Sequence, residues 1–422
     1  METKTIESKL LNEKYVEISH KSGLKIFIME KPDYTGAFAM FGTKYGSVDT
    51  CFKLKNEVNY TKVPEGIAHF LEHKLFESED LDAFQRFEKT GANANAFTSF
   101  DKTCYIFQCA DNFSESLEIL LDFVKHPYFT EATVQKEQGI IGQEIKMYQD
   151  SPDWQVLFNL LRGLYANNPV RIDIAGTVES IAQINADLLY SCYNTFYNLS
   201  NMALAVVGNV TVNQVLEIAD KVLQDEKPVE LEQIIPDEPV EAETDYIEEV
   251  MSVDIPKFAV GFKETISAPI RTAKEVVSMN IALDIIAGKT SPLYNSLIAS
   301  GLINPTFGSE YFIGRGFAAP MFSGESKTPE KVKDAILKNI ENLKQNGIND
   351  DDFNISRKRL YGLALRSFND VDDIAGNIVD SYFNGSDLFE EIECYKIVTK
   401  ADIESTIKTC FDTDKMCLSV IK

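Results

Sequence analysis

Two of the four histidines in this chain of 422 residues stand four positions apart, in the stretch GIAHFLEHKLFE. They are His69 and His73, and Glu72 directly precedes the second. In the helix that we predict around residues 65–77, positions i, i+3 and i+4 project together. Two neutral imidazoles at this spacing can chelate one Zn²⁺. A carboxylate beside them can take the proton of a water that the metal activates.

A hydrolytic zinc site needs a third protein ligand and one open position for water. The stretch EQGIIGQE offers Glu137 and Glu144, which are seven residues apart and lie on one face of a second predicted helix. Their neighbours are apolar on one side, where a carboxylate needs a cation or hydrogen-bond donors. The spacing alone does not choose between the two glutamates.

The surrounding segments predict the elements that must position these side chains. The stretches VEISHKSGLKIFIMEKPD and AFAMFGTKYGSVD read as strands before the histidine helix, and NANAFTSFD and TCYIFQCA read as strands after it. Two helical stretches follow, FSESLEILLDFVKHP and TEATVQKEQGIIGQEIKMYQDSP. The buried strand MALAVVGNV then closes this part of the chain.

The pattern starts again after residues 225–249, where three prolines and many carboxylates predict an interdomain linker. Beyond it, a helix, a short polar break and a longer helix recur, and CLSVIK ends the chain as MALAVVGNV ended the first part. We therefore predict an α+β protein with two similar halves, residues 1–224 and 250–422. Each half is an antiparallel sheet covered by helices, and together they make a bowl-shaped chain.

Composition narrows the class of protein. The chain is 44% hydrophobic and 25% charged, as in globular proteins with more than one core, and its net charge is −24. So acidic a surface argues against nucleic acid or membrane headgroups as partners. The stretch METKTIESKLLNEKY has no apolar region typical of a secretory signal. Seven scattered cysteines without a CxxC motif predict reduced thiols in the cytoplasm.

Three motifs carry a resemblance to a known family. GIAHFLEHKLF, NANAFTSFDKTCYIF and KEQGIIGQEIKM, in this order, resemble the pitrilysin/insulinase inverzincin metallopeptidases, which include mitochondrial processing peptidase. The resemblance extends to SGLKIFI and YGSVD before the motif and to RIDIAGTVESIAQI and YNLSNMALAVVGNV after it. Within the family, the chain is similar to half-length bacterial members, in particular to the zinc-binding subunit of two-protein pairs, and to the beta subunit of mitochondrial processing peptidase.

The resemblance implies a zinc-dependent endopeptidase with one Zn²⁺ per chain. In the family's Glu-x6-Glu pattern the second glutamate ligates zinc and the first supports the site. Carried over, the ligands are His69, His73 and Glu144, Glu72 is the general base, and Glu137 orients a ligand or tunes the metal.

The segment Asn95-Ala96-Phe97-Thr98 matches the family's Asn-Ala-x-Thr sequence, which is an edge strand beside the metal. There a peptide substrate adds as a further strand, and the Asn side chain helps to hold the scissile region. Main-chain hydrogen bonds bind any extended peptide in this way, while pockets select its side chains. The resemblance therefore implies substrate binding by Asn95, Ala96, Phe97 and Thr98, in an enclosed chamber that admits peptides or unfolded segments.

The chain departs from the family where the second half normally supplies an Arg and a Tyr to the substrate carbonyl. The matching positions hold Ile298 and Pro305, and the nearby Tyr311 and Arg315 have a different spacing. Oxyanion donors contribute several kcal/mol to catalysis, so the chain alone should be weak. We therefore expect a homologous partner chain that lacks HxxEH and supplies the Arg/Tyr pair, with a homodimer as the alternative.

The second half is predicted to have no metal site. Its sequence has no histidine after His126, and superposing the repeats puts Leu363 near the position of Glu144. Two other functions stay open at this point: a non-catalytic scaffold or binding subunit, and a maturation protease dedicated to one modified peptide. An intact set of metal ligands with a base argues against the scaffold, which needs neither.

Overall fold

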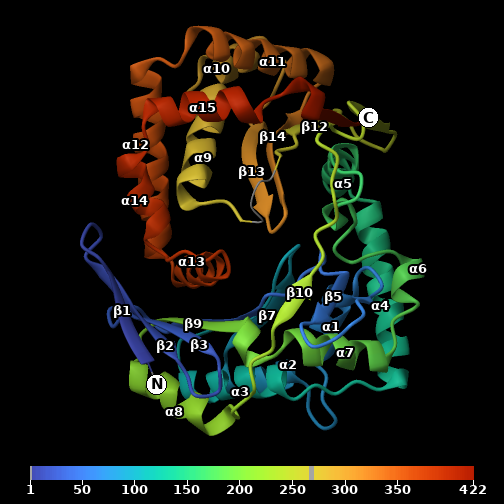
Figure 1. Ribbon diagram of the computed structural model, residues 1–422, viewed down its shortest axis with the longest axis vertical. Coiled ribbons are helices and arrows are strands. Elements are labelled where there is room, and N and C mark those ends of the chain that lie inside the picture. Colours follow the sequence, from blue (N-terminus) through green and yellow to red (C-terminus); the bar gives the residue numbers. More distant parts are fainter. Residues whose placement is uncertain (1, 266–269) are drawn as a thin grey trace. The chain divides into compact units, whose positions relative to one another are not determined.

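The computed structural model describes residues 2–265 and 270–422, and the chain forms two compact units (Figure 1). Each unit is assembled from three separate segments. The first consists of Met1–Ile145, Asp173–Ile234 and Ser367–Phe389, and the second of Lys146–Ile172, Ile235–Arg366 and Glu390–Lys422.

The first unit is built on a seven-stranded sheet with the strand order β1-β2-β3-β9-β4-β8-β7. Neighbouring strands are antiparallel except β3 and β9, which are parallel, so the sheet is mixed. The central strands β4 and β9 are buried along their whole length. The strands are β1 (Glu2–Ser8), β2 (Glu13–Ser19), β3 (Lys25–Glu30), β4 (Ala37–Thr43), β7 (Asn93–Thr98), β8 (Thr103–Cys109) and β9 (Met202–Gly208).

Helices cover both faces of this sheet. The helix pair α3 and α8 lies on one face and α13 on the other, where α13 packs against β4 and β9 (Figure 1). The helices are α1 (Ile67–Leu75), α2 (Ala83–Thr90), α3 (Phe113–Lys125), α4 (Glu131–Gln149), α6 (Val178–Ile181), α7 (Ala186–Phe196), α8 (Val212–Val222) and α13 (Val371–Phe383). A small second sheet joins β10 (Leu231–Gln233), β5 (Cys51–Leu54) and β6 (Thr61–Lys62).

The second unit has a five-stranded sheet with the strand order β11-β15-β12-β14-β13, in which only β11 and β15 are parallel. Its strands are β11 (Tyr246–Glu249), β12 (Lys257–Phe262), β13 (Gly308–Gly314), β14 (Phe317–Glu325) and β15 (Met416–Ile421). Its helices are α5 (Pro152–Leu164), α9 (Ala273–Ala287), α10 (Pro292–Ala299), α11 (Pro329–Asn346), α12 (Asp350–Arg366), α14 (Glu390–Ile397) and α15 (Lys400–Cys410). From Val277 to its end at Ala287, every residue of α9 except Asn280 is buried in the core of this unit.

The predicted α+β fold is confirmed, and the pair α3–α4 has its counterpart in α11–α12. One helix from each part of the chain, however, packs on the sheet of the other part. Helix α13 lies on the first sheet, and α5 lies against β12 and β15 of the second. The expected boundaries 1–224 and 250–422 follow the sequence repeat and do not include this exchange, because the repeat shows which segments correspond but not which sheet each helix covers.

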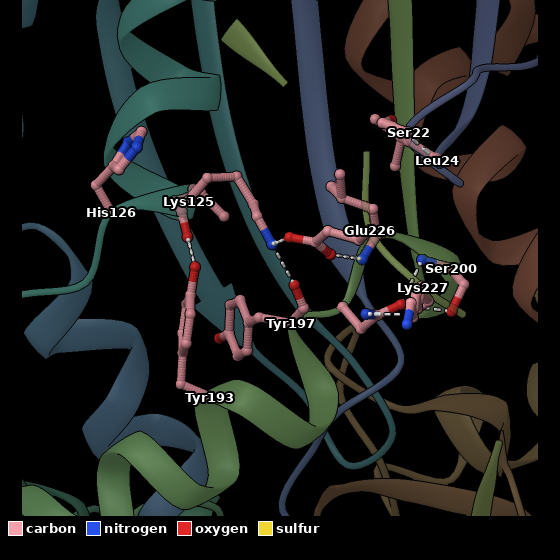
Figure 2. A network of polar contacts seen from close by, with 12 residues as sticks. Ser22, Leu24, Lys125, His126, Tyr193, Tyr197, Ser200, Glu226 and Lys227 are labelled. Atoms are coloured by element: carbon pink, nitrogen blue, oxygen red, sulfur yellow. Dashed lines mark hydrogen bonds and ion pairs between the residues drawn. The ribbon is translucent and has the colours of Figure 1, made fainter. Parts of the chain in front are cut away.

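The acidic segment 225–249 is anchored to both units. In the first unit, Glu226 accepts a hydrogen bond from the backbone N–H of Leu199 at 2.8 Å and pairs with Lys125 at 2.8 Å. The Lys125 ammonium also donates to the Tyr197 carbonyl at 2.6 Å (Figure 2). A few residues later, β10 pairs with β5. The segment that composition assigns to a linker therefore contributes two strands, β10 and the later β11 (Tyr246–Glu249), and a partly buried ion pair.

In the second unit, Glu238 anchors the acidic segment. Its carboxylate accepts hydrogen bonds from the backbone N–H groups of Ala166, Asn167 and Asn168 at 2.7, 2.8 and 2.8 Å. It also lies 3.3 Å from the ammonium of the buried Lys263. Three N–H donors and a cation around one carboxylate make this contact a strong, charge-assisted anchor. Within the described residues, no helix has the length and apolar character needed to cross a membrane.

Candidate active site

Helix α1, which carries both histidines, begins against a distant segment of the same unit. Gly66 precedes it with φ of +85°, and a Cβ atom there would lie 2.3 Å from the Ala175 carbonyl oxygen. The Ser180 hydroxyl donates to the Glu65 carbonyl at 2.9 Å. Only glycine combines this left-handed backbone with so close an approach. The stretch RIDIAGTVESIAQI therefore sets where α1 starts.

The same stretch also holds α4, the helix of the two glutamates. The side-chain amide of Gln138 donates to the carbonyls of Ile181 and Ile184 at 3.3 and 3.0 Å. One segment thus contacts both helices that carry predicted ligands. In the sequence this stretch stands out only through its resemblance to the family, and no local signal predicts its supporting role.

The three predicted ligands converge between α1 and α4. His69 Nε2 lies 3.6 Å from one oxygen of Glu144, and His73 Nε2 lies 3.5 Å from the other. These separations are too long for good hydrogen bonds. They are close to the edge of a tetrahedron, about 3.4 Å, around a zinc ion with bonds of about 2.0–2.1 Å. Ligand atoms of all three residues lie within 4.8 Å of one another, so the donor set fits one metal ion.

Glu137 lies behind His73 rather than among the converging atoms. Its side chain is buried, and its Oε1 is 3.0 Å from His73 Nδ1. A carboxylate on Nδ1 holds the proton there and leaves the Nε2 lone pair toward Glu144. Burial lowers the pKa of His73, but the bond to Glu137 and the charges of Glu72 and Glu144 outweigh burial and raise this pKa above its ordinary value.

Glu72 is buried beside the histidines, with 8% of its surface exposed. Its Oε2 accepts a hydrogen bond of 2.8 Å from the Thr98 hydroxyl, which leaves Oε1 for another partner. The prediction for Thr98 named substrate binding. The contact with Glu72 is an additional role, which could have been inferred only from the three-dimensional pairing of α1 with β7.

Strand β7 is the edge of its sheet and pairs with β8 alone within the described part of the chain. Its side chains alternate, so that Asn95 and Phe97 are exposed while Ala96 and Thr98 are half-buried. The Asn95 carboxamide oxygen accepts from the N–H of Ala96 at 2.9 Å. The outer backbone groups of this strand have the arrangement that a further strand needs.

The positions expected to lack an Arg/Tyr pair lie in the second unit. Ile298 is 37% exposed at the end of α10, and Pro305 is exposed before β13. Burial and the nearby Glu264 carboxylate raise the pKa of Tyr311 on β13. Leu363 on α12 is an exposed apolar residue.

Comparisons with known proteins show the family of the chain. A sequence model described as "Insulinase (Peptidase family M16)" matches residues 59–178, and one described as "Peptidase M16 inactive domain" matches residues 183–360. The zinc protease YmfH of Bacillus subtilis (strain 168) is 39% identical over 422 residues, 98% of this chain and 97% of that protein. The mitochondrial-processing peptidase subunit beta of Caenorhabditis elegans is 29% identical over 180 residues, 41% of this chain and 38% of that protein.

Solved structures show the same fold. An M16-like peptidase from Alicyclobacillus acidocaldarius superposes with a TM-score of 0.92 at 31% identity, covering 100% of this chain and 98% of that one. Pitrilysin superposes with a TM-score of 0.76 at 15% identity, covering 100% of this chain and 46% of that one, and so supports the fold alone. The fold is that of the insulinase-like M16 peptidases. The chain belongs to peptidase family M16.

Proposed function

We propose that the chain is a zinc-dependent endopeptidase whose metal is held by His69, His73 and Glu144. The observation that carries this proposal is the spacing of the donor atoms: 3.5 and 3.6 Å from the two Nε2 atoms to the Glu144 oxygens, with a buried carboxylate beside them. Imidazole and carboxylate donors in this number suit zinc. The relatives that are named zinc proteases support the choice of metal.

Zinc bound there supplies Lewis-acid activation of a water molecule. In this proposal Glu72 is the general base: the hydrogen bond from Thr98 occupies Oε2, and Oε1 would take the proton. The bond between Glu137 and His73 Nδ1 keeps that imidazole in one orientation. These two contacts restrict the orientations of the Glu72 and His73 side chains. Such preorganisation favours catalysis.

Peptide binding is proposed along the free edge of β7. An extended peptide would pair with the backbone of Asn95–Thr98 and bring one of its carbonyls next to the metal ligands. The exposed Phe97 and the Asn95 side chain lie on the outward face of that strand and would contact substrate side chains. Main-chain pairing of this kind favours unfolded or flexible segments, because these can become extended and offer unpaired backbone groups to β7.

We also propose that a homologous chain completes the site. Ile298 and Pro305 cannot donate a side-chain hydrogen bond to a substrate carbonyl, so the oxyanion must be stabilised from elsewhere. A partner that lacks HxxEH but carries the Arg/Tyr pair would provide this and close a chamber. Seven free cysteines support a reducing compartment, which we take to be the cytoplasm.

The test is cleavage of a mixed peptide pool, read by mass spectrometry. The chain is assayed alone and with a homologous chain that carries the Arg/Tyr pair, each with and without a zinc chelator. We expect strong cleavage only in the mixture, lost with chelator and restored by zinc. Strong cleavage by the chain alone would remove the need for a partner. No cleavage in any mixture would favour a scaffold or a single dedicated substrate.

A further inference from the structure

The hairpin that carries the proposed substrate strand is held by a residue from the other end of the chain. Lys102 lies in the turn between β7 and β8, and its ammonium is 2.5 Å from the carboxylate of Asp380 on α13. The Lys102 side chain is only 20% exposed, whereas that of Asp380 is 45% exposed. Most of the lysine is therefore enclosed, and the aspartate is the ion-pair partner that allows its charge to stay there.

The Lys102 backbone closes the turn that ends β7. The N–H of Ser99 donates to the Lys102 carbonyl at 2.8 Å. At the end of β7, directly before Ser99, the Thr98 hydroxyl donates to Glu72 at 2.8 Å. At the start of β8, directly after Lys102, the Thr103 hydroxyl donates to the Tyr45 carbonyl at 2.8 Å. A displacement of Lys102 would therefore move the turn next to the residue that contacts the general base.

Helix α13 is a rigid support for Asp380. Gly42 on β4 has no side chain, and a Cβ there would lie 3.2 Å from Val379, so the helix packs closely on the sheet. The Lys44 ammonium lies over the rings of Tyr382 and Phe383, 5.4 and 5.3 Å from their centroids. Cation–π contacts of this kind add to the packing. Asp380 is thus presented by a fixed helix and not by a loop.

We propose that Asp380 is a positioning residue of the active site: through Lys102 it keeps the β7–β8 turn in place, so that the edge of β7 stays aligned for a peptide. This inference rests on the proposed peptidase function. It makes residues 367–389, which lie in the sequence half without a metal site, one of the supports of the half that has one.

The β7–β8 turn has other supports, and these limit the effect of removing the ion pair between Lys102 and Asp380. The N–H groups of Ser47 and Val48 donate to the carbonyls of Ser99 and Phe100 at 3.0 and 2.9 Å. These bonds hold the turn to the neighbouring loop when the ion pair is lost. Asp380→Asn should consequently loosen β7 without unfolding it, and it should weaken substrate binding more than the chemical step.

The experiment compares Asp380→Asn with a matched control, Glu118→Gln. Glu118 pairs with Lys221 at 2.7 Å in the same unit, but both side chains are exposed and stand on helices α3 and α8 rather than in the hairpin. The first readout is hydrogen exchange of residues 93–103, which needs no substrate. We expect it to be about fivefold faster in Asp380→Asn, the upper range for a partly exposed ion pair, and unchanged in the control.

The second readout is the cleavage of a quenched fluorescent peptide taken from the cleaved pool, with the partner chain present. We expect KM to rise about fivefold, kcat and zinc content to stay within about twofold, and Asp380→Glu to restore both readouts. Unchanged exchange in residues 93–103 would overturn the positioning role whether or not the protein is a peptidase. Faster exchange with unchanged KM would overturn its relevance to the reaction. If Asp380→Asn does not fold, the reversed pair Lys102→Asp/Asp380→Lys tests the same contact.

Discussion

Replacing Thr98 by valine tests how the general base is oriented. Valine has nearly the same shape as threonine and the same preference for strands, so β7 should keep its structure. The change removes the hydroxyl that donates to Glu72 Oε2 at 2.8 Å. Because Glu72 is only 8% exposed, little water is at hand to replace that donor.

The magnitude follows from the charge on the acceptor. Hydrogen bonds to charged groups contribute about 1.5–3 kcal/mol, which corresponds to roughly 10- to 150-fold in rate if the whole contribution serves the orientation of Glu72. A general base contributes about 10²- to 10⁴-fold in total, which limits the loss from above. We expect kcat to fall about 10- to 100-fold.

The assay is steady-state cleavage of a fluorogenic peptide by zinc-loaded protein with its partner chain. KM and zinc content should stay within about twofold of the wild type, and Thr98→Ser, which retains a hydroxyl, should recover most of kcat. A rise in KM with unchanged kcat would show that the Thr98 hydroxyl acts on the substrate and would refute this reasoning.

Two further predictions concern the proposed metal site, one for a ligand and one for a supporting residue, and a third concerns stability. Glu144→Ala should lose zinc outright, measured by mass spectrometry of metal content, whereas the exposed neighbour Gln143→Ala should retain one ion per chain. Glu137→Ala should keep zinc at saturating metal but lose about 10- to 100-fold in kcat/KM, because His73 loses the partner of its Nδ1. Glu238→Ala should lower the free energy of unfolding by about 3 kcal/mol in urea titrations, since three N–H groups and a buried lysine lose their acceptor. Asp237 is an exposed carboxylate next to Glu238, and Asp237→Ala should change the free energy of unfolding by less than about 0.5 kcal/mol.

The centre of the candidate site could be predicted because helical spacing determines it. His69, Glu72 and His73 share one turn of α1, so their side chains had to project together once the segment was helical. Spacing could not separate Glu137 from Glu144, because both lie on one face of α4. The three-dimensional contacts distinguish them: the Glu144 oxygens face both Nε2 atoms, while Glu137 contacts Nδ1 of one ring.

The exchange of α5 and α13 between the two sheets could not be predicted from the sequence. An amphipathic pattern shows that a helix has a buried face but does not say which sheet covers that face. The same holds for the acidic segment, which has the composition of a solvated linker: Glu226 binds the largely enclosed Lys125, and Glu238 binds the buried Lys263. Such contacts join residues far apart in sequence, and no local signal marks them.

Whether the HxxEH helix is a working peptidase centre is tested most directly by the cleavage rate of Glu72→Gln beside that of the wild type. Both proteins are loaded with zinc, mixed with the partner chain and assayed on the same peptide, with the metal content measured in parallel. The proposal predicts equal zinc in the two proteins and a loss of about 10²- to 10⁴-fold in kcat for Glu72→Gln. Equal rates at equal zinc content would contradict it, because the activity would then not depend on the base in this motif.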